Sequence, residues 1–180
     1  RKLDEFDIAC IEEPYNPAFV PRNGDTNLFA RLSDLQEHIK TPVCLDESVV
    51  TAQDMEEAMD FDNLKCYALK VAKFGGIQPT LDFYKWAREQ GKVTWMGGMF
   101  DTGVSKRMHA AFATLPGMDL PADVSDFTEY FEHDTALPPL QLHEGELVLN
   151  TVDHPAGLGC VLDKDYLRSV LVDEVTITKD

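Results

Sequence analysis

The amino-acid sequence predicts a parallel α/β fold, and three observations lead to this prediction. Short apolar runs alternate with longer amphipathic segments through most of the chain. The runs are largely apolar on both faces, which is typical of buried strands in a parallel sheet. The intervening segments are long enough for the helices that connect parallel strands. An open doubly wound sheet and a closed barrel both fit this alternation.

Four apolar runs are the predicted strands. They cover residues 6–11, 42–45, 66–69 and 93–96. Each run has the length of a strand and is followed by a polar residue or a glycine. We therefore expect four consecutive strands of one parallel sheet.

The segments after these runs have helical patterns. The predicted helices cover residues 28–39, 51–59, 80–90 and 105–115. In the first, leucines and an isoleucine recur at spacings of four, three and four, as in a helix that packs on a sheet. Thr51 and Asp54 resemble a capping box at the start of the second, and Gly91 follows the third as a C-cap.

The character of the sequence changes after residue 121. Segment 140–149 has the pattern of a hairpin with Glu144 and Gly145 at its turn, and the pair Pro138-Pro139 precedes it. We predict a β/α part followed by a loop-rich C-terminal part. The predicted ranges are 1–134 and 135–180.

The composition excludes several classes of protein. The 180 residues carry a formal net charge of −16, which disfavours nucleic-acid binding because phosphate contacts need a basic surface. No apolar run approaches the roughly 20 residues of a membrane span. The four cysteines have no C-x-x-C spacing, and three lie in apolar runs, so we expect free thiols in a reducing, cytoplasmic setting.

Charged residues end three successive predicted strands. Glu12, Asp46 and Lys70 each come directly after the last apolar residue of a run. Because the carboxyl ends of parallel strands lie at the same edge, we expect these three side chains at one mouth of the fold, where barrel enzymes carry their active sites. The alternative is that strands simply end where polarity begins.

Two carboxylates at neighbouring strand ends suit Mg²⁺, with Mn²⁺ as an alternative, because hard cations prefer oxygen ligands. Zinc is disfavoured because the histidines and cysteines lack ligand spacing. Lys70 opposite such a cation would serve as a base, an acid or an electrostatic stabiliser. Its structural alternative is a salt bridge to Asp46 or Glu12.

Five motifs together resemble the enolase superfamily, and within its muconate-lactonizing subgroup the branch of o-succinylbenzoate synthases and N-succinylamino acid racemases. The motifs are IEEP (11–14), LDES (45–48), LKVAKFGG (69–76), WMGGMFDTG (95–103) and LP followed by PADVS (115–125). The resemblance implies that the chain forms the C-terminal part, strands four to eight, of a TIM-like (β/α)7β barrel. It also implies that the last segment returns to a capping domain.

The resemblance implies a role for each matching residue. Glu12 and Asp46 would bind Mg²⁺, and Lys70 would be one of two lysines beside the substrate's α-carbon. Glycine and methionine after the seventh barrel strand would line the substrate pocket, and four charged residues would lie next to the ligands. The residues of the pocket would be Gly97, Gly98 and Met99. The charged neighbours of the ligands would be Glu13, Glu47, Lys73 and Asp101.

The implied reaction is abstraction of a proton α to a carboxylate, which gives an enediolate. Enolase-type sites carry out this reaction with Mg²⁺ and a lysine base. In the synthases this reaction leads to dehydration, giving o-succinylbenzoate for menaquinone biosynthesis. Racemisation of N-succinylamino acids and muconate-type cycloisomerisation are alternatives, because one frame supports all three. The substrate would be a small carboxylate.

The chain departs from the family pattern in four ways. It lacks the third metal carboxylate and the Lys-x-Lys motif of earlier strands, Asp101 stands where Glu is usual, and Lys73 stands where the racemases often have Arg. We therefore expect about half of such an enzyme, inactive alone, that belongs to a longer protein or associates with another copy or a companion chain. A non-catalytic half barrel that serves assembly is the alternative from another class.

Overall fold

The computed structural model describes residues 2–16, 18, 20, 27–149 and 157–178. They form two compact units. Unit 1 contains Arg1–Gly97 and Ala113–Asp123, and unit 2 contains Gly98–Phe112 and Val124–Asp180. The predicted division into residues 1–134 and 135–180 stays a prediction; within unit 2, Asp134 accepts a hydrogen bond from Gly103 and Pro138 accepts one from Arg107.

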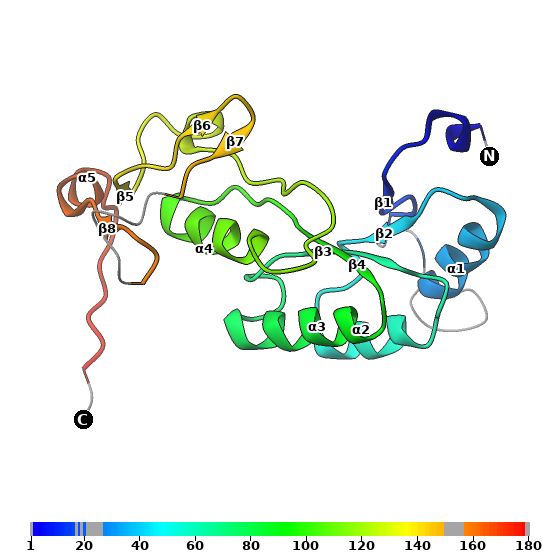
Figure 1. Cartoon of the computed structure of the whole chain (residues 1–180). Coiled ribbons are helices and arrows are strands. Elements are labelled where there is room, and N and C mark those ends of the chain that lie inside the picture. The colour runs from blue at the N-terminus through cyan, green and yellow to red at the C-terminus, as the bar shows by residue number, and fades with distance from the viewer. Residues whose placement is uncertain (1, 17, 19, 21–26, 150–156, 179–180) are drawn as a thin grey trace. The chain divides into compact units, whose positions relative to one another are not determined.

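Unit 1 is built on a parallel sheet of four strands in the order β1-β2-β3-β4, with α2 and α3 on one face (Figure 1). The strands are β1 (Ile11–Glu12), β2 (Val43–Leu45), β3 (Cys66–Leu69) and β4 (Val93–Met96). Beyond β4, Met118 forms an isolated parallel bridge with Thr94 and so continues the parallel order. The predicted parallel α/β class is confirmed.

The first strand differs from its prediction. Residues Leu3–Phe6 form a 3-10 helix, η1, and β1 begins only at Ile11. The carboxylate of Asp4 accepts hydrogen bonds from the amides of Lys40 and Thr41, which holds η1 against the loop before β2. The apolar run from residue 6 to 11 is therefore mostly outside the sheet, and the side chain of Phe6 is exposed.

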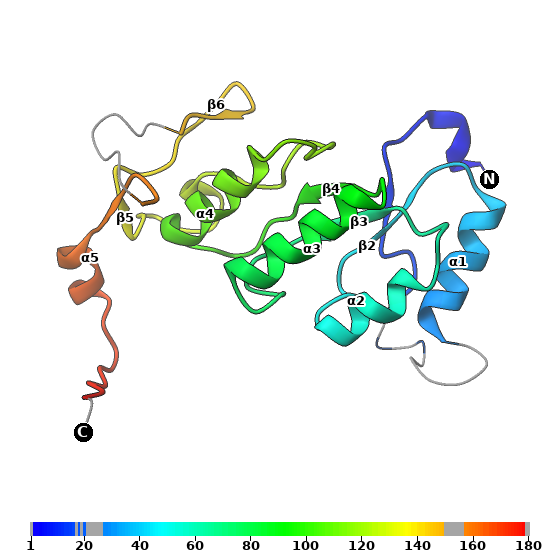
Figure 2. The same ribbon diagram turned by 60° about the horizontal axis from the view of Figure 1, so that its bottom comes forward.

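Three helices of unit 1 follow the predicted pattern, and Figure 2 brings them forward. They are α1 (Leu28–His38), α2 (Ala52–Met59) and α3 (Ile77–Glu89). The capping box of α2 is confirmed, because Thr51 accepts from the amide of Asp54 and the Asp54 carboxylate accepts from the amide of Thr51. Helix α3 begins three residues earlier than predicted, directly after Gly76, whose φ of 129° favours glycine.

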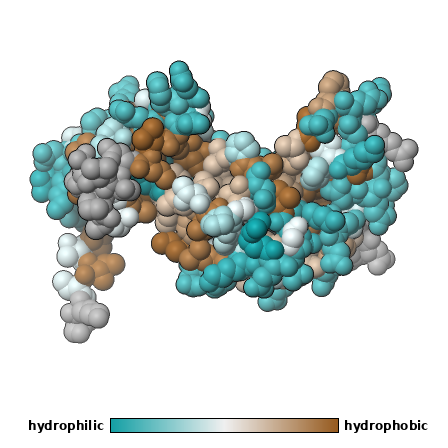
Figure 3. All heavy atoms as spheres, viewed as in Figure 1, coloured by the Kyte–Doolittle hydropathy of each residue, from teal (hydrophilic) through white to brown (hydrophobic). Residues whose placement is uncertain are grey.

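The two faces of the sheet have different surroundings. Successive side chains of a strand point to opposite faces, so Val43 and Leu45 face the helices while Cys44 faces the other way. On that second face, the side chains of Cys44, Cys66 and Ala68 form a buried apolar cluster. The same alternation places Asp46 and Lys70 on the second face, just beyond the ends of β2 and β3. Figure 3 shows mainly hydrophilic side chains on the outer surface of α2.

Unit 2 contains a long helix and short β elements. These are α4 (Gly103–Ala113), η2 (Phe127–Glu129), β5 (Ala136–Leu137), β6 (Leu142–His143), β7 (Glu146–Leu147), β8 (Val161–Leu162) and α5 (Lys164–Ser169). The predicted hairpin is confirmed as β6 and β7, with positive φ angles at Glu144 and Gly145. Two positive φ angles in succession are typical of a type I′ turn.

All four cysteines are free thiols, as the sequence predicts. The neighbouring thiol of Cys66 and burial raise the pKa of Cys44, and burial raises the pKa of Cys10. Among the residues that the structure describes, no helix is long and apolar enough to cross a membrane.

The capping box generates a test of the fold. Replacing Thr51 by Ala should lower the free energy of unfolding by about 1 kcal/mol, because α2 loses the side-chain acceptor for its first-turn amide. Urea unfolding followed by circular dichroism measures this change. Thr176→Ala, in an exposed segment outside any helix or strand, is the control and should change stability by less than about 0.5 kcal/mol. Equal losses in both variants would contradict a capping role.

Candidate functional site: an acidic cluster with two lysines

The carboxyl ends of β1, β2 and β3 bring together the charged residues that the sequence singled out. Carboxylate oxygens of Glu12, Asp46 and Glu47 lie within 4.8 Å of one another. With Lys70 they line an open cleft of about 570 Å³. The clustering predicted from three separate strand ends is therefore present in the structure.

Asp46 is the centre of this cluster and is 1% exposed. Its Oδ2 atom lies 2.5 Å from Nζ of Lys70, and its Oδ1 atom lies 2.5 Å from Nζ of Lys73. Burial alone would raise the pKa of Asp46, but the two ammonium groups outweigh burial and lower it. Asp46 is thus an ionised carboxylate near neutral pH, and both of its oxygens are bound by lysines.

The two lysines differ in their surroundings. Burial lowers the pKa of Lys70, but the hydrogen bond and the charge of Asp46 outweigh it, so the net shift is upward. Lys73 is buried more deeply, and burial leaves its pKa lowered although it also contacts Asp46. Nζ of Lys73 donates further to the carbonyl oxygens of Asp46 and Ala68, at 2.8 and 3.0 Å. Lys73 is therefore a fixed support of the β2 end, whereas Lys70 faces the cleft.

Glu13 lies beside the cluster and holds the turn after β2. Its Oε2 atom accepts hydrogen bonds from the amides of Asp46 and Ser48 and from the Ser48 hydroxyl, at 2.9, 3.1 and 2.9 Å. Burial raises the pKa of Glu13 in spite of these bonds. This contact of Ser48 was not predicted from the sequence. The second acid of the motif at 11–14 and a serine two residues beyond Asp46 are the signals that point to this contact.

Glu12 has the most perturbed carboxylate of the cluster. Burial, the hydrogen bond to Asp46 and the negative charge of Asp46 raise its pKa to about 7, although Lys70 opposes this shift. Like charges held close together favour protonation of one of them. A divalent cation at the cluster would relieve this repulsion.

Gly97 follows β4 and packs against Lys70. A Cβ atom at this position would lie 2.7 Å from Cε and 3.3 Å from Cγ of Lys70, so only glycine leaves the lysine side chain its present path. Gly98, Met99 and Asp101 belong to unit 2. Their predicted places at the pocket and near the ligands stay predictions; within unit 2, Asp101 lies 3.3 Å from Nδ1 of His109.

The donor set fits a hard divalent cation. Three carboxylates supply oxygen atoms within reach of one ion, which is the type of ligand that Mg²⁺ and Mn²⁺ prefer. Because Lys70 and Lys73 already bind both oxygens of Asp46, a cation that uses Asp46 competes with Lys70 for Oδ2. Lys70 is the side chain at the cleft that such an exchange would release.

A parallel α/β sheet with acids and a lysine at the carboxyl ends of its strands defines a class of protein, the α/β proteins that carry their functional site at this edge. The family described as Enolase C-terminal domain-like matches residues 1–166, and the chain belongs to this family. The resemblance drawn from the five motifs is confirmed, and so is the fold class.

Two relatives carry names of characterised enzymes. The o-succinylbenzoate synthase of Bacillus subtilis is 28% identical over 93% of this chain and 42% of its own length. The N-succinylamino acid racemase of Thermus thermophilus is 31% identical over 98% of this chain and 43% of its own length. The chain therefore spans less than half the length of these relatives.

Solved structures agree with this fold. An enolase superfamily member from Listeria innocua superposes with a TM-score of 0.79 at 28% identity, over 93% of this chain and 42% of that one. The muconate lactonizing enzyme from Klebsiella pneumoniae gives a TM-score of 0.76 at 26% identity, over 94% and 44%. Both cover this chain almost entirely.

The raised pKa of Glu12 predicts a pH dependence of stability for the metal-free chain. Its folded pKa of about 7 exceeds the ordinary value of 4.5, so the folded state binds more protons between these pH values. Stability should therefore fall as pH rises through this window. Urea unfolding with a chelator present measures the slope, and in Glu12→Gln the slope should become flatter.

Glu56→Gln is the matched control, because it removes one negative charge from the exposed side of α2. In this variant the free energy of unfolding should change between pH 4.5 and pH 7 by as much as it does in the unaltered chain. A slope unaffected by Glu12→Gln, or equally affected by Glu56→Gln, would contradict the assignment to Glu12.

Proposed function

We propose that this chain supplies the acidic cluster and one catalytic lysine of a Mg²⁺-dependent enzyme that abstracts a proton α to a carboxylate, and that the complete protein is an o-succinylbenzoate synthase. The observation that carries the proposal is the position of Lys70. Its ammonium group lies at the same strand edge as three clustered carboxylates and is bound to one of them. This pairing puts a lysine, which becomes a proton acceptor once it is released from Asp46 and deprotonated, beside an anionic site for a cation.

Each residue has a defined task in this proposal. Glu12 and Asp46 would hold Mg²⁺ with Glu47 next to them, and the ion when bound would supply Lewis-acid polarisation of the substrate carboxylate. Lys70 leaves Asp46 and releases its ammonium proton to solvent, and the neutral amine then accepts the α-proton of the substrate. Lys73 stays on Asp46 and keeps that carboxylate in place. Gly97 leaves room for Lys70 to move between these positions.

The substrate assignment rests on the relatives and on Lys73. Several relatives are named o-succinylbenzoate synthase. The alternatives are N-succinylamino acid racemase, which is the name of the Thermus relative, and a muconate-type cycloisomerase. A lysine at position 73 departs from the arginine common in racemases, which favours the synthase. Free thiols favour a cytoplasmic enzyme, and its dehydration step would serve menaquinone biosynthesis.

The proposal is tested first by metal binding. Calorimetric titration of the chain with Mg²⁺ should show one site that Asp46→Asn weakens by roughly tenfold or more, because it removes a charged ligand. Asp62→Asn, a similar charge change in an exposed loop, should leave the affinity unchanged. Unchanged affinity in Asp46→Asn would remove Asp46 from the ligands. No Mg²⁺ binding to the chain or to the complete protein would favour the non-catalytic half barrel.

Catalysis by Lys70 is tested in the complete protein. Lys70→Ala should lower kcat on the o-succinylbenzoate synthase substrate by about 10² to 10⁴-fold, the range typical of a lost general base. The melting temperature should change little, because Lys73 still neutralises Asp46. Retained turnover would contradict a catalytic Lys70, and a large loss of melting temperature would make the Lys70 salt bridge structural.

The same assays compare the candidate activities. Turnover of the synthase substrate with slow turnover of N-succinylamino acids would support the synthase, and the reverse order would support the racemase. Lys73→Arg is the informative variant, because it restores the residue common in racemases and should raise racemisation relative to dehydration.

A further inference from the structure

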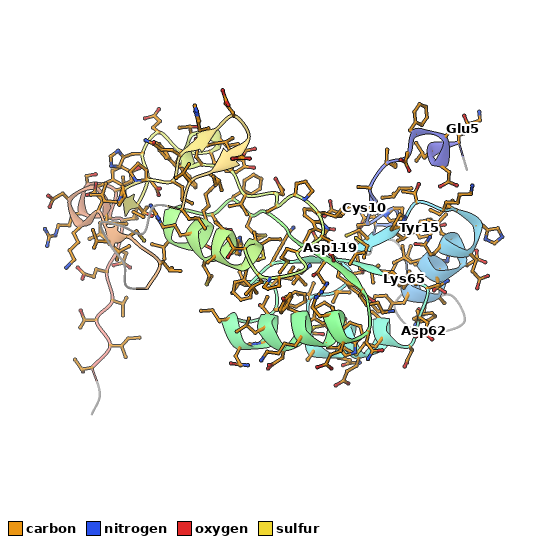
Figure 4. All side chains as sticks on the ribbon, viewed as in Figure 1. Glu5, Cys10, Tyr15, Asp62, Lys65 and Asp119 are labelled. Atoms are coloured by element: carbon orange, nitrogen blue, oxygen red, sulfur yellow. The ribbon has the colours of Figure 1, made fainter. Side chains whose placement is uncertain are left out.

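Three thiols converge on the face of the sheet that lies away from the helices. The Sγ atoms of Cys10, Cys44 and Cys66 lie within 4.8 Å of one another. Cys10 directly precedes β1, Cys44 is in β2 and Cys66 is in β3. The register pairs Cys44 directly with Cys66. Cys44 and Cys66 are fully buried, whereas Cys10 is partly exposed at the edge of the sheet, where Figure 4 labels it.

The thiols form a site of their own next to the acidic cluster. Cys10 precedes Glu12 by two residues and Cys44 precedes Asp46 by two, so each thiol lies on the same face of the extended chain as the acid that follows it. Val93, Leu120 and Ala68 pack around them and supply only apolar atoms. Among the described residues, two polar groups contact Cys44: Nε1 of Trp95 donates to its Sγ at 3.2 Å, and its thiol donates to the carbonyl oxygen of Leu45 at 3.9 Å.

These contacts suit a soft cation rather than a hard one. Sulfur ligands in an apolar surrounding select ions such as Cu⁺, whereas Mg²⁺ prefers oxygen. A metal–sulfur bond of about 2.3 Å places three sulfur atoms about 4 Å apart around one ion, which lies within the observed spread of 4.8 Å. The indole N–H directed at Cys44 stabilises negative charge on that sulfur, as hydrogen bonds from outside the ligand set do in metal sites.

We propose that Cys10, Cys44 and Cys66 form a binding site for one Cu⁺ ion with three sulfur ligands. Each thiol that becomes a ligand releases its proton to solvent, and the copper keeps its oxidation state, so no oxidant or reductant takes part. The ion enters past Cys10, which is the partly exposed member of the three. The site uses no residue of the proposed Mg²⁺ cluster and does not depend on the proposed function.

The test is anaerobic titration of the chain with Cu⁺ in competition with a chromogenic Cu⁺ chelator. We expect one tightly bound ion per chain. Cys66→Ala and Cys10→Ser should each weaken binding by roughly 100-fold or more, since loss of even an outer partner costs about 10 to 100-fold. Cys160→Ser is the matched control, because this cysteine belongs to unit 2, and it should bind like the unaltered chain.

Two further measurements keep the outcome clear. X-ray absorption of the Cu⁺-loaded unaltered chain should show sulfur neighbours only, and circular dichroism establishes that each variant is folded. Binding that survives in folded Cys10→Ser and Cys66→Ala, nitrogen or oxygen neighbours around copper, or loss of binding in Cys160→Ser would each overturn the proposal. Absence of tight binding to the folded, reduced chain would overturn it as well, and would leave the thiols as ordinary core residues.

Discussion

The rest of the site depends on one constraint, the burial of the Asp46 carboxylate. A buried carboxylate is stable as an ion only where positive charge and hydrogen bonds replace water. Lys70 and Lys73 supply the charge, and both reach Asp46 because the turn after β3 folds back over the end of β2. Glu13 fixes the backbone of the same residue from the other side. Without Glu13 the buried amide of Asp46 would lose its acceptor, whereas without Lys70 the Asp46 carboxylate would still be paired with Lys73.

Alternation along the strands connects the core with the chemistry. One face of the sheet, which carries Val43, Leu45 and Met96, is covered by helices. The other face carries the thiols and, beyond them, the charged residues. Residues two positions apart on a strand share a face, so the nature of this face changes from sulfur to carboxylate within a single step along β2. A hard-cation site and a soft-cation site thus stand next to each other without sharing a ligand.

Much of this arrangement is readable from the sequence. Strands β3 and β4, the capping box at Thr51 and the turn at Glu144 agree with their predictions because local patterns determine them. The acidic cluster was predictable because parallel strands end at one edge. The position of β1 was not, since its run of apolar residues is displaced by the contacts of Asp4 with the next loop. The double contact of Asp46 depends on the path of the turn at 70–76, which no local pattern encodes.

Because acids are adjacent in the sequence, a shift of the strand register would leave the charges at the cleft nearly the same. In both acidic motifs a glutamate follows the expected ligand, and a slip of β1 by one residue would replace Glu12 by an identical side chain. Composition at the cleft would hardly change, yet the bonds from Glu13 to Ser48 would be lost. Those bonds, and the positive φ of Glu13, therefore favour the observed register of β1. A misaligned chain would carry the right charges at the cleft and the wrong turn beneath them.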